Sequence, residues 1–175
     1  MEFVQSGKYS EVHYDRSRKV FIKTFQPKLA DRLRYALRIR PYPGRNFVIV
    51  AERLKALGIR VPEVLAFERY RLEMRDVEAP ELRGLILDDV ALQERYVELI
   101  IKLYRDRIHC RGLHTKNFLV KDGELVAIDL DAYKAPRLIH YSGREFLTCL
   151  KRSLGGPEAF LYQRIVERLG VTDAP

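Results

Sequence analysis

The sequence predicts an α+β fold of two lobes, an antiparallel sheet followed by mainly helices. Short apolar runs separated by polar turns fill the first part of the chain, and helical periodicity dominates the last part. With 175 residues, of which 47% are hydrophobic, the chain is long enough for one compact domain or two small lobes. A short connector, EAPEL, separates the two patterns. We therefore expect lobes at residues 1–80 and 81–175.

The first lobe is expected to begin with three short strands. FVQ, EVHYD and KVFIKTF are separated by the turn-forming stretches SGKYS and DRSR, as in an antiparallel meander. Residues 28–40 and 46–58 predict two helices, the first of which is basic and is ended by PYPG. Their apolar positions are Leu29, Leu33, Ala36 and Leu37 in the first helix and Phe47, Val50, Ala51 and Leu54 in the second. Two further strands are expected at 61–70 and 71–77.

The second lobe is expected to be mainly helical. Its clearest helix covers residues 90–107. The inward-facing positions of that helix are Leu92, Tyr96, Leu99, Ile100 and Leu103. In FLVKDGELVAIDL two apolar strands flank an Asp-Gly pair, which is a strong signal of a β-hairpin. Two closing helices, at about 142–154 and 157–169, are separated by the break GGP.

Positive charge is concentrated in the first third of the chain. The net charge is +8, and residues 1–60 hold 14 lysines and arginines against 5 acids, whereas residues 61–175 hold 18 against 19. Such a face suits phosphates, acidic sugars, anionic lipid headgroups or nucleic acid, although a solvated helix face has the same composition. No apolar run approaches the roughly 18 residues of a membrane span, and the first residues lack a signal-peptide pattern. A cytoplasmic location is therefore expected, and the isolated Cys110 and Cys149 indicate neither disulfides nor zinc.

Three residues of the first lobe have the pattern that phosphoryl transfer from a nucleotide requires. Such transfer uses a lysine on a strand, a glutamate on the next helix that braces it, and a loop over the phosphates. Lys23 ends the apolar strand KVFIK, Glu52 lies in the second helix, and Gly7 lies in the turn SGKYS. Each residue also has a simpler interpretation. Lys23 is then a solvated strand end, Glu52 a solvent-facing glutamate and Gly7 part of an ordinary turn.

Asn117 and Asp129 are stronger candidates, as ligands of a magnesium ion. The polar cluster in LHTKNFLV runs straight into one apolar strand, and the next strand ends in IDLD. Both residues are therefore expected side by side, at the start of one strand and the end of the next, where their oxygens suit magnesium. Asp129 is also expected to take part in catalysis. A carboxylate ending an apolar strand is otherwise costly beside a core. Asp131 is open to three interpretations: a second metal contact, a base for the acceptor, or a turn residue.

RGLHTKNFLV followed by AIDLDAYK resembles the catalytic loop and metal-binding strand of bacterial lipopolysaccharide core kinases. Their small relatives, of the InaA and toluene-tolerance types, belong to the wider protein-kinase-like superfamily. The resemblance extends to Lys23, to the helix of Glu52 and to LGIRVPEVL. It implies a compact two-lobed protein-kinase-like fold with ATP and magnesium as cofactors. Lys23 then holds the α and β phosphates with Glu52 as its brace, and Asn117 and Asp129 ligate the metal.

One position departs from the kinase loop pattern H-R-D-L-x-x-x-N. In that pattern the catalytic aspartate lies five residues before the metal-binding asparagine. The corresponding residue here is Gly112, preceded by Cys110 and Arg111, so the usual base is absent. His114 is the nearest replacement, because an imidazole titrates near neutral pH. Alternatively, His114 contacts phosphate or braces the loop.

Three functions remain open from the sequence. The leading one is an ATP- and magnesium-dependent phosphotransferase acting on a sugar hydroxyl of a surface glycolipid or on another small acceptor. Residues 28–45 then face an anionic membrane, and the protein is peripheral at the inner membrane face. The second is a nucleotide-binding pseudokinase or regulatory module, which Gly112 favours. The third, a nucleic-acid binder, ranks last because no recognised binding motif accompanies the charge.

Overall fold

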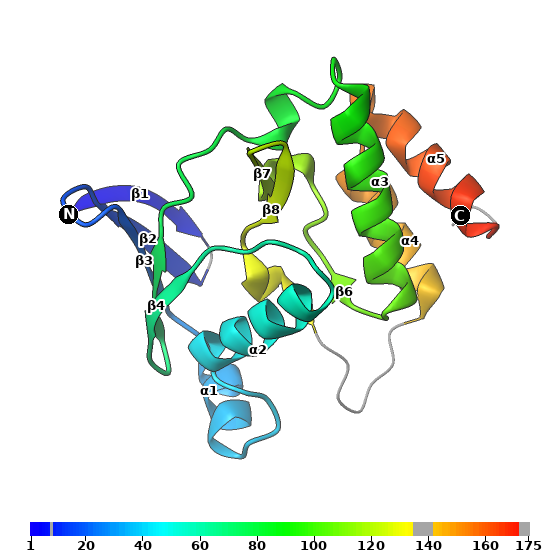
Figure 1. Ribbon diagram of the computed structural model, residues 1–175. Helices are drawn as coiled ribbons and strands as arrows, with labels where there is room; N and C mark the ends of the chain where they lie inside the picture. Colours follow the sequence, from blue (N-terminus) through cyan, green and yellow to red (C-terminus); the bar gives the residue numbers. More distant parts are fainter. Residues whose placement is uncertain (8, 135–141, 172–175) are drawn as a thin grey trace. The chain divides into compact units, whose positions relative to one another are not determined.

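The computed structural model describes residues 1–7, 9–134 and 142–171. The chain divides into two compact units (Figure 1). The first comprises Met1–Glu52 and Pro62–Val77, and the second comprises Arg53–Val61 and Glu78–Pro175.

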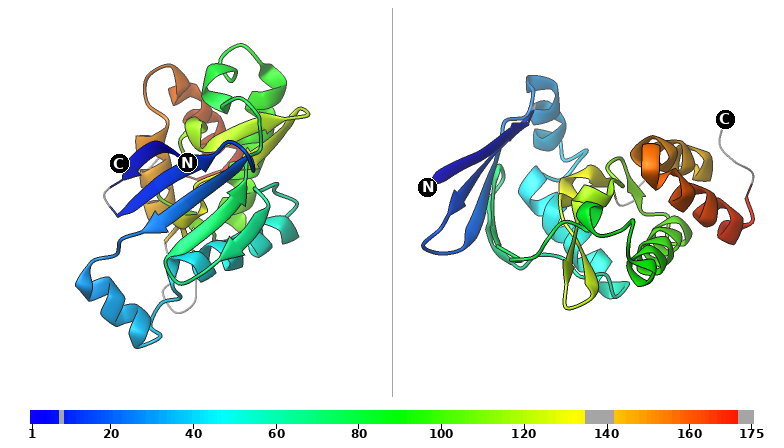
Figure 2. Two further views of the ribbon diagram at one scale, coloured as in Figure 1. Left: turned by 90° about the vertical axis from the view of Figure 1, so that its left-hand side faces the viewer. Right: turned by 90° about the horizontal axis from the view of Figure 1, so that it is seen from above.

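The first unit is built on an antiparallel sheet of five strands in the order β1-β2-β3-β5-β4 (Figure 2). The strands are β1 (Glu2–Gly7), β2 (Ser10–Asp15), β3 (Val20–Phe25), β4 (Val64–Phe67) and β5 (Arg71–Arg75). The predicted meander and the later strand pair are both confirmed. The middle strand β3 carries much of the core, because Val20, Ile22 and Phe25 are buried.

Two helices connect β3 to β4. The first, α1 (Leu29–Ala36), has no buried residue and ends earlier than the sequence predicts. The second, α2 (Pro43–Ala56), buries its predicted apolar positions Phe47, Val50, Ala51 and Leu54. Pro43 of the PYPG stretch is the first residue of α2, where a proline is favoured because no intrahelical partner is needed for its nitrogen.

Three longer helices lie in the second unit. They are α3 (Val90–Arg105), α4 (Gly143–Ser153) and α5 (Ala159–Leu169), and α5 packs on both α3 and α4 (Figures 1 and 2). The apolar face predicted for α3 is buried. Side-chain caps begin two of these helices, since Asp89 accepts from the Leu92 amide at 3.0 Å and Ser142 from the Glu145 amide at 3.1 Å.

Short strands and 3-10 helices complete the second unit. The strands are β6 (His109–Cys110), β7 (Phe118–Lys121), β8 (Glu124–Ala127) and β9 (Tyr133–Lys134), and the 3-10 helices are η1 (Leu82–Gly84), η2 (Thr115–Asn117), η3 (Leu130–Ala132) and η4 (Gly156–Glu158). The predicted β7–β8 hairpin is confirmed. Asp122 and Gly123 both have positive φ, at 55° and 74°, as the tight two-residue turn requires. None of the helices in the described ranges is long and apolar enough to cross a membrane.

Candidate functional site

In the second unit, the loop of residues 111–117 lies against the segment that follows β8. The Ile128 amide donates to the Asn117 carbonyl at 2.9 Å, and the Arg111 amide donates to the Ala132 carbonyl at 3.3 Å. The pairing of β6 with β9 joins the same two stretches at their other ends. The backbone therefore brings Asn117 next to the residue that precedes Asp129.

Asn117 and Asp129 present oxygen atoms that suit magnesium. The Asn117 side-chain nitrogen donates to the Gly112 carbonyl at 2.7 Å, so the opposite atom of the amide, its oxygen, is the one that could ligate a cation. Asp129 is exposed and has left-handed backbone angles, φ 57° and ψ 45°. That conformation costs a residue other than glycine about 1–2 kcal/mol, and such strain occurs often at functional sites.

No group of three or more His, Cys, Asp or Glu residues that could hold a metal ion occurs among the described residues. A magnesium ion commonly takes only one or two protein carboxylates and completes its shell with phosphate oxygens and water. The donor set of Asn117 and Asp129 therefore fits an ion that arrives with a nucleotide. Asp131 lies within η3, where the Ala132 amide donates to the Asp129 carbonyl at 3.0 Å, so its backbone forms a turn.

Gly112 makes room for the side chain of Asn117. A Cβ atom at Gly112 would lie 2.8 Å from the Asn117 side-chain nitrogen and 3.5 Å from Ala132 Cβ. Gly112 is not one of the glycines with positive φ. A side chain at position 112 would therefore displace the Asn117 amide, whereas the backbone angle of Gly112 does not itself require glycine.

Two buried hydrogen bonds anchor the loop to distant elements. The Tyr96 hydroxyl of α3 donates to the Leu113 carbonyl at 2.5 Å, and the Thr115 hydroxyl donates to the Glu158 carboxylate of η4 at 2.6 Å. Arg83 lies 3.6 Å from the same carboxylate, which is buried and would be costly without these partners. Sequence reasoning missed both anchors, since the partners lie 17 and 43 residues apart and no local pattern relates them.

His114 is held by the C-terminal end of α4. Its Nδ1 lies 3.1 Å from the Ser153 carbonyl oxygen, and His114 is half-buried. Because a carbonyl only accepts hydrogen bonds, Nδ1 carries the proton, and Nε2 of the neutral ring is left with a lone pair. This hydrogen bond ties the loop to α4, as expected if His114 braces the loop. It also leaves Nε2 able to accept a proton, as required if His114 replaces the catalytic base.

The neighbouring Cys110 and His109 are structural. Burial raises the pKa of the Cys110 thiol to about 12, and the Gly112 amide donates to its sulfur at 3.3 Å. The thiol therefore stays protonated near neutral pH and is a poor nucleophile. His109 is 1% exposed in β6, and its ring packs edge-on against Phe146 with 6.4 Å between ring centroids.

The first unit holds the residues predicted to contact the phosphates of ATP. Lys23 is only 6% exposed on β3, with its ammonium nitrogen 5.6 Å from the centroid of the Phe25 ring, so it is not a solvated strand end. Glu52 is exposed on α2, and its role as a brace for Lys23 stays a prediction. Gly7 is the last residue of β1, paired with Ser10 of β2 beside the turn. Its role over the phosphates is also still a prediction.

Comparisons with known proteins identify the fold. No family model matches the chain. The sequence is 32% identical over 115 residues to the RIO-type serine/threonine-protein kinase Rio1 of Haloferax volcanii, a match covering 62% of this chain and 39% of that protein. The chain thus matches well under half the length of that relative.

A solved structure extends the likeness to the whole chain. The Rio2 kinase–ADP/Mg2+–phosphoaspartate complex from Chaetomium thermophilum has a TM-score of 0.57 and 19% sequence identity, covering 100% of this chain and 58% of that one. Neither Rio1 nor Rio2 is a lipopolysaccharide core kinase by its description. The chain therefore has a protein-kinase-like fold of the α+β class.

Proposed function

We propose that this chain is an ATP- and magnesium-dependent phosphotransferase. The joining of the Asn117 loop to the Asp129 segment, through the Ile128 amide, is the observation that supports this proposal most. Asn117 and Asp129 bind the magnesium ion, which neutralises charge on the phosphates. Lys23 holds the α and β phosphates, Glu52 braces it, and the Gly7 turn covers them. The Rio2 structure contains ADP and Mg2+, in keeping with this assignment.

The acceptor in this proposal is a hydroxyl of a small molecule, such as a sugar of a surface glycolipid. Because the transition state of phosphoryl transfer is loose, the acceptor needs little deprotonation before attack. His114 Nε2 takes that proton in place of the missing aspartate. The second candidate function is nucleotide binding without transfer, which the filling of the space at Gly112 by Asn117 favours.

Binding of ATP with magnesium should raise the thermal stability of the protein. At concentrations about a hundredfold above the dissociation constant, the expected stabilisation is about 2.7 kcal/mol, and a thermal-shift titration measures it. Asp129→Ala should remove the magnesium-dependent part of the shift. Asp88→Ala, which removes an exposed carboxylate elsewhere in the second unit, should leave it unchanged. A folded wild-type protein that shows no shift at millimolar ATP and magnesium would contradict the proposal.

We also propose that α1 binds an anionic membrane, which would bring the phosphotransferase to a glycolipid acceptor. The leucines of this helix and of its C-cap are solvent-exposed: Leu29 is 82%, Leu33 60% and the C-cap Leu37 62% exposed. These residues recur every four positions and so share one face of the helix. Exposed apolar residues gathered on one face commonly mark an interaction surface.

Cations border this apolar face on both sides. Arg32 and Arg34 flank Leu33 in the sequence, and a rotation of about 100° per residue puts one on each side of the leucine row. Their long side chains suit a membrane interface, where the apolar stem stays near the lipid and the charge reaches the headgroups. A nucleic acid offers no partner for the leucine row itself.

Charge reversal at Arg34 of α1 and at Arg38, two residues after the helix, should release the protein from anionic vesicles. Each surface cation contributes about 1 kcal/mol, so loss of the two cations in Arg34→Glu with Arg38→Glu should weaken vesicle binding by about 30-fold or more at low salt. Vesicle co-sedimentation with phosphatidylserine, compared with phosphatidylcholine alone, measures this. Arg16→Glu with Arg18→Glu, in the turn before β3, is the matched control. Retention of duplex DNA without vesicle binding would favour a nucleic-acid partner instead.

A further inference from the structure

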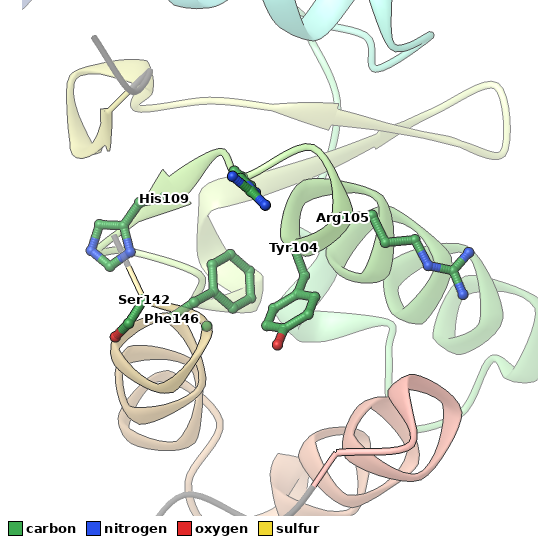
Figure 3. Close-up of a pocket in the computed structure, with 7 residues that line it drawn as sticks. Tyr104, Arg105, His109, Ser142 and Phe146 are labelled. Atoms are coloured by element: carbon green, nitrogen blue, oxygen red, sulfur yellow. The ribbon is translucent and has the colours of Figure 1, made fainter. Parts of the chain in front are cut away.

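Ser142, at the start of α4, lines two cavities. The first, of about 390 Å³, is lined by residues of three elements, among them Tyr104, His109 and Phe146 (Figure 3). The second, of about 530 Å³, is lined by Arg111, Arg144 and Arg152 together with Ser142, Glu145 and Thr148. Both lie entirely within the second unit.

The arginines of these cavities differ from the others of the second unit. Elsewhere the partners are Asp122 for Arg60, Glu158 for Arg83, Glu124 for Arg95, Glu94 for both Arg164 and Arg168, and the Asp106 carbonyl for Arg53. In the part of this unit that the structure describes, the arginines with neither a carboxylate nor a carbonyl partner are Arg105, Arg107, Arg111, Arg144 and Arg152. All five line the two cavities.

The second cavity combines this charge with a position beside the transfer loop. Arg144, Thr148 and Arg152 recur every four residues along one face of α4, and Arg111 completes the wall from the loop. Arg111 directly precedes Gly112, and its amide donates to the Ala132 carbonyl near Asp129. The wall carries three guanidinium groups against the single carboxylate of Glu145.

We propose that the second cavity binds a phosphate group carried by the acceptor substrate. This inference rests on the proposed phosphotransferase function and names its substrate class, a small hydroxyl compound that is already phosphorylated. A guanidinium binds phosphate through two parallel hydrogen bonds, and the three guanidinium groups that line this cavity have no carboxylate partner in the described part of the unit, so an anion would offset their charge. The Thr148 hydroxyl already donates to the Arg144 carbonyl at 2.9 Å, which holds it beside the arginines.

The shape of the site favours a compact anion over a nucleic-acid strand. A volume of about 530 Å³ lies in the range of small-molecule sites, whereas single-stranded nucleic acid follows an extended basic groove with stacking aromatic side chains. The lining of this cavity contains no aromatic residue among the described residues. The net positive charge of its wall matches a phosphate dianion.

Calorimetric titration with inorganic phosphate, in the presence of ADP and magnesium and at constant ionic strength, tests the inference. Arg144→Gln with Arg152→Gln should weaken phosphate binding by at least about tenfold, because two bidentate contacts are lost. Arg95→Gln with Arg168→Gln removes the same charge from paired arginines and should change the affinity by less than about twofold. ATP and magnesium should bind all three proteins equally.

The outcomes separate this inference from the function on which it rests. Equal phosphate affinity in the two double variants overturns the phosphate site, whatever the nucleotide result. Absence of ATP binding in every protein overturns the phosphotransferase proposal. The phosphate titration still tests the cavity independently of that result. If the binding of single-stranded RNA depends on Arg144 and Arg152 but the binding of phosphate does not, the cavity wall is a nucleic-acid surface. The proposal of an acceptor phosphate site is then wrong.

Discussion

Replacing His114 with alanine should lower the rate of phosphoryl transfer by about 10²- to 10⁴-fold, the range typical of a general base. The hydrogen bond from Nδ1 to the Ser153 carbonyl fixes the ring, and Nε2 is left to accept the proton of the acceptor hydroxyl. Because this proton moves only during transfer, the affinity for ATP should stay nearly unchanged. Steady-state kinetics combined with a direct measurement of ATP affinity tests both statements.

His114→Asn distinguishes the base from the brace. An asparagine amide donates a hydrogen bond to a carbonyl but does not take up a proton near neutral pH. If His114 is the base, the asparagine variant loses as much activity as the alanine variant. Recovery of activity in His114→Asn would show that the side chain only holds the loop to α4. A loss confined to weaker ATP binding would assign His114 to phosphate contact instead.

The parts of the fold that the sequence predicts are those determined by local patterns. The hairpin between Phe118 and Ala127 follows from its Asp-Gly pair, since few other residues tolerate two consecutive positive φ angles. The helices α2 and α3 follow from apolar residues at helical spacing, all of which are buried. The same hairpin joins the loop of Asn117 to the segment that leads to Asp129, because the Ile128 amide donates to the Asn117 carbonyl at 2.9 Å. That the two side chains hold a metal ion stays a prediction.

Contacts between distant residues and exposure at the surface have no such local signal. His114 meets Ser153 across 39 residues, and Thr115 meets Glu158 across 43. The leucines of α1 have the spacing of a core-facing stripe, yet that helix buries no residue. The arginine cavity lies in a half of the chain whose total charge is nearly balanced, so its local charge appears only when ion pairs elsewhere are identified.

Substituting aspartate for Gly112 should weaken the magnesium-dependent binding of ATP rather than restore a kinase base. The added Cβ would meet the Asn117 side-chain nitrogen at 2.8 Å, so the amide must leave the Gly112 carbonyl. Loss of that hydrogen bond costs about 0.5–1.5 kcal/mol, which corresponds to an affinity reduced by up to about tenfold, with a similar loss of stability. Titration of ATP with and without magnesium, alongside the melting temperature, measures both effects.

Gly112→Ala is the matched variant, because it adds the same Cβ without a carboxylate. If displacement of Asn117 is the cause, alanine and aspartate should weaken magnesium-dependent binding by similar amounts, and ATP binding without magnesium should change little in either. Adding Asn117→Ala to Gly112→Asp should then weaken magnesium-dependent ATP binding little further. The effects of substituting two contacting residues are not additive once the first substitution has removed their interaction. A gain of transfer activity in Gly112→Asp but not in Gly112→Ala would show instead that the site still accommodates an acidic base, and that Gly112 is a substituted catalytic position rather than a partner of Asn117.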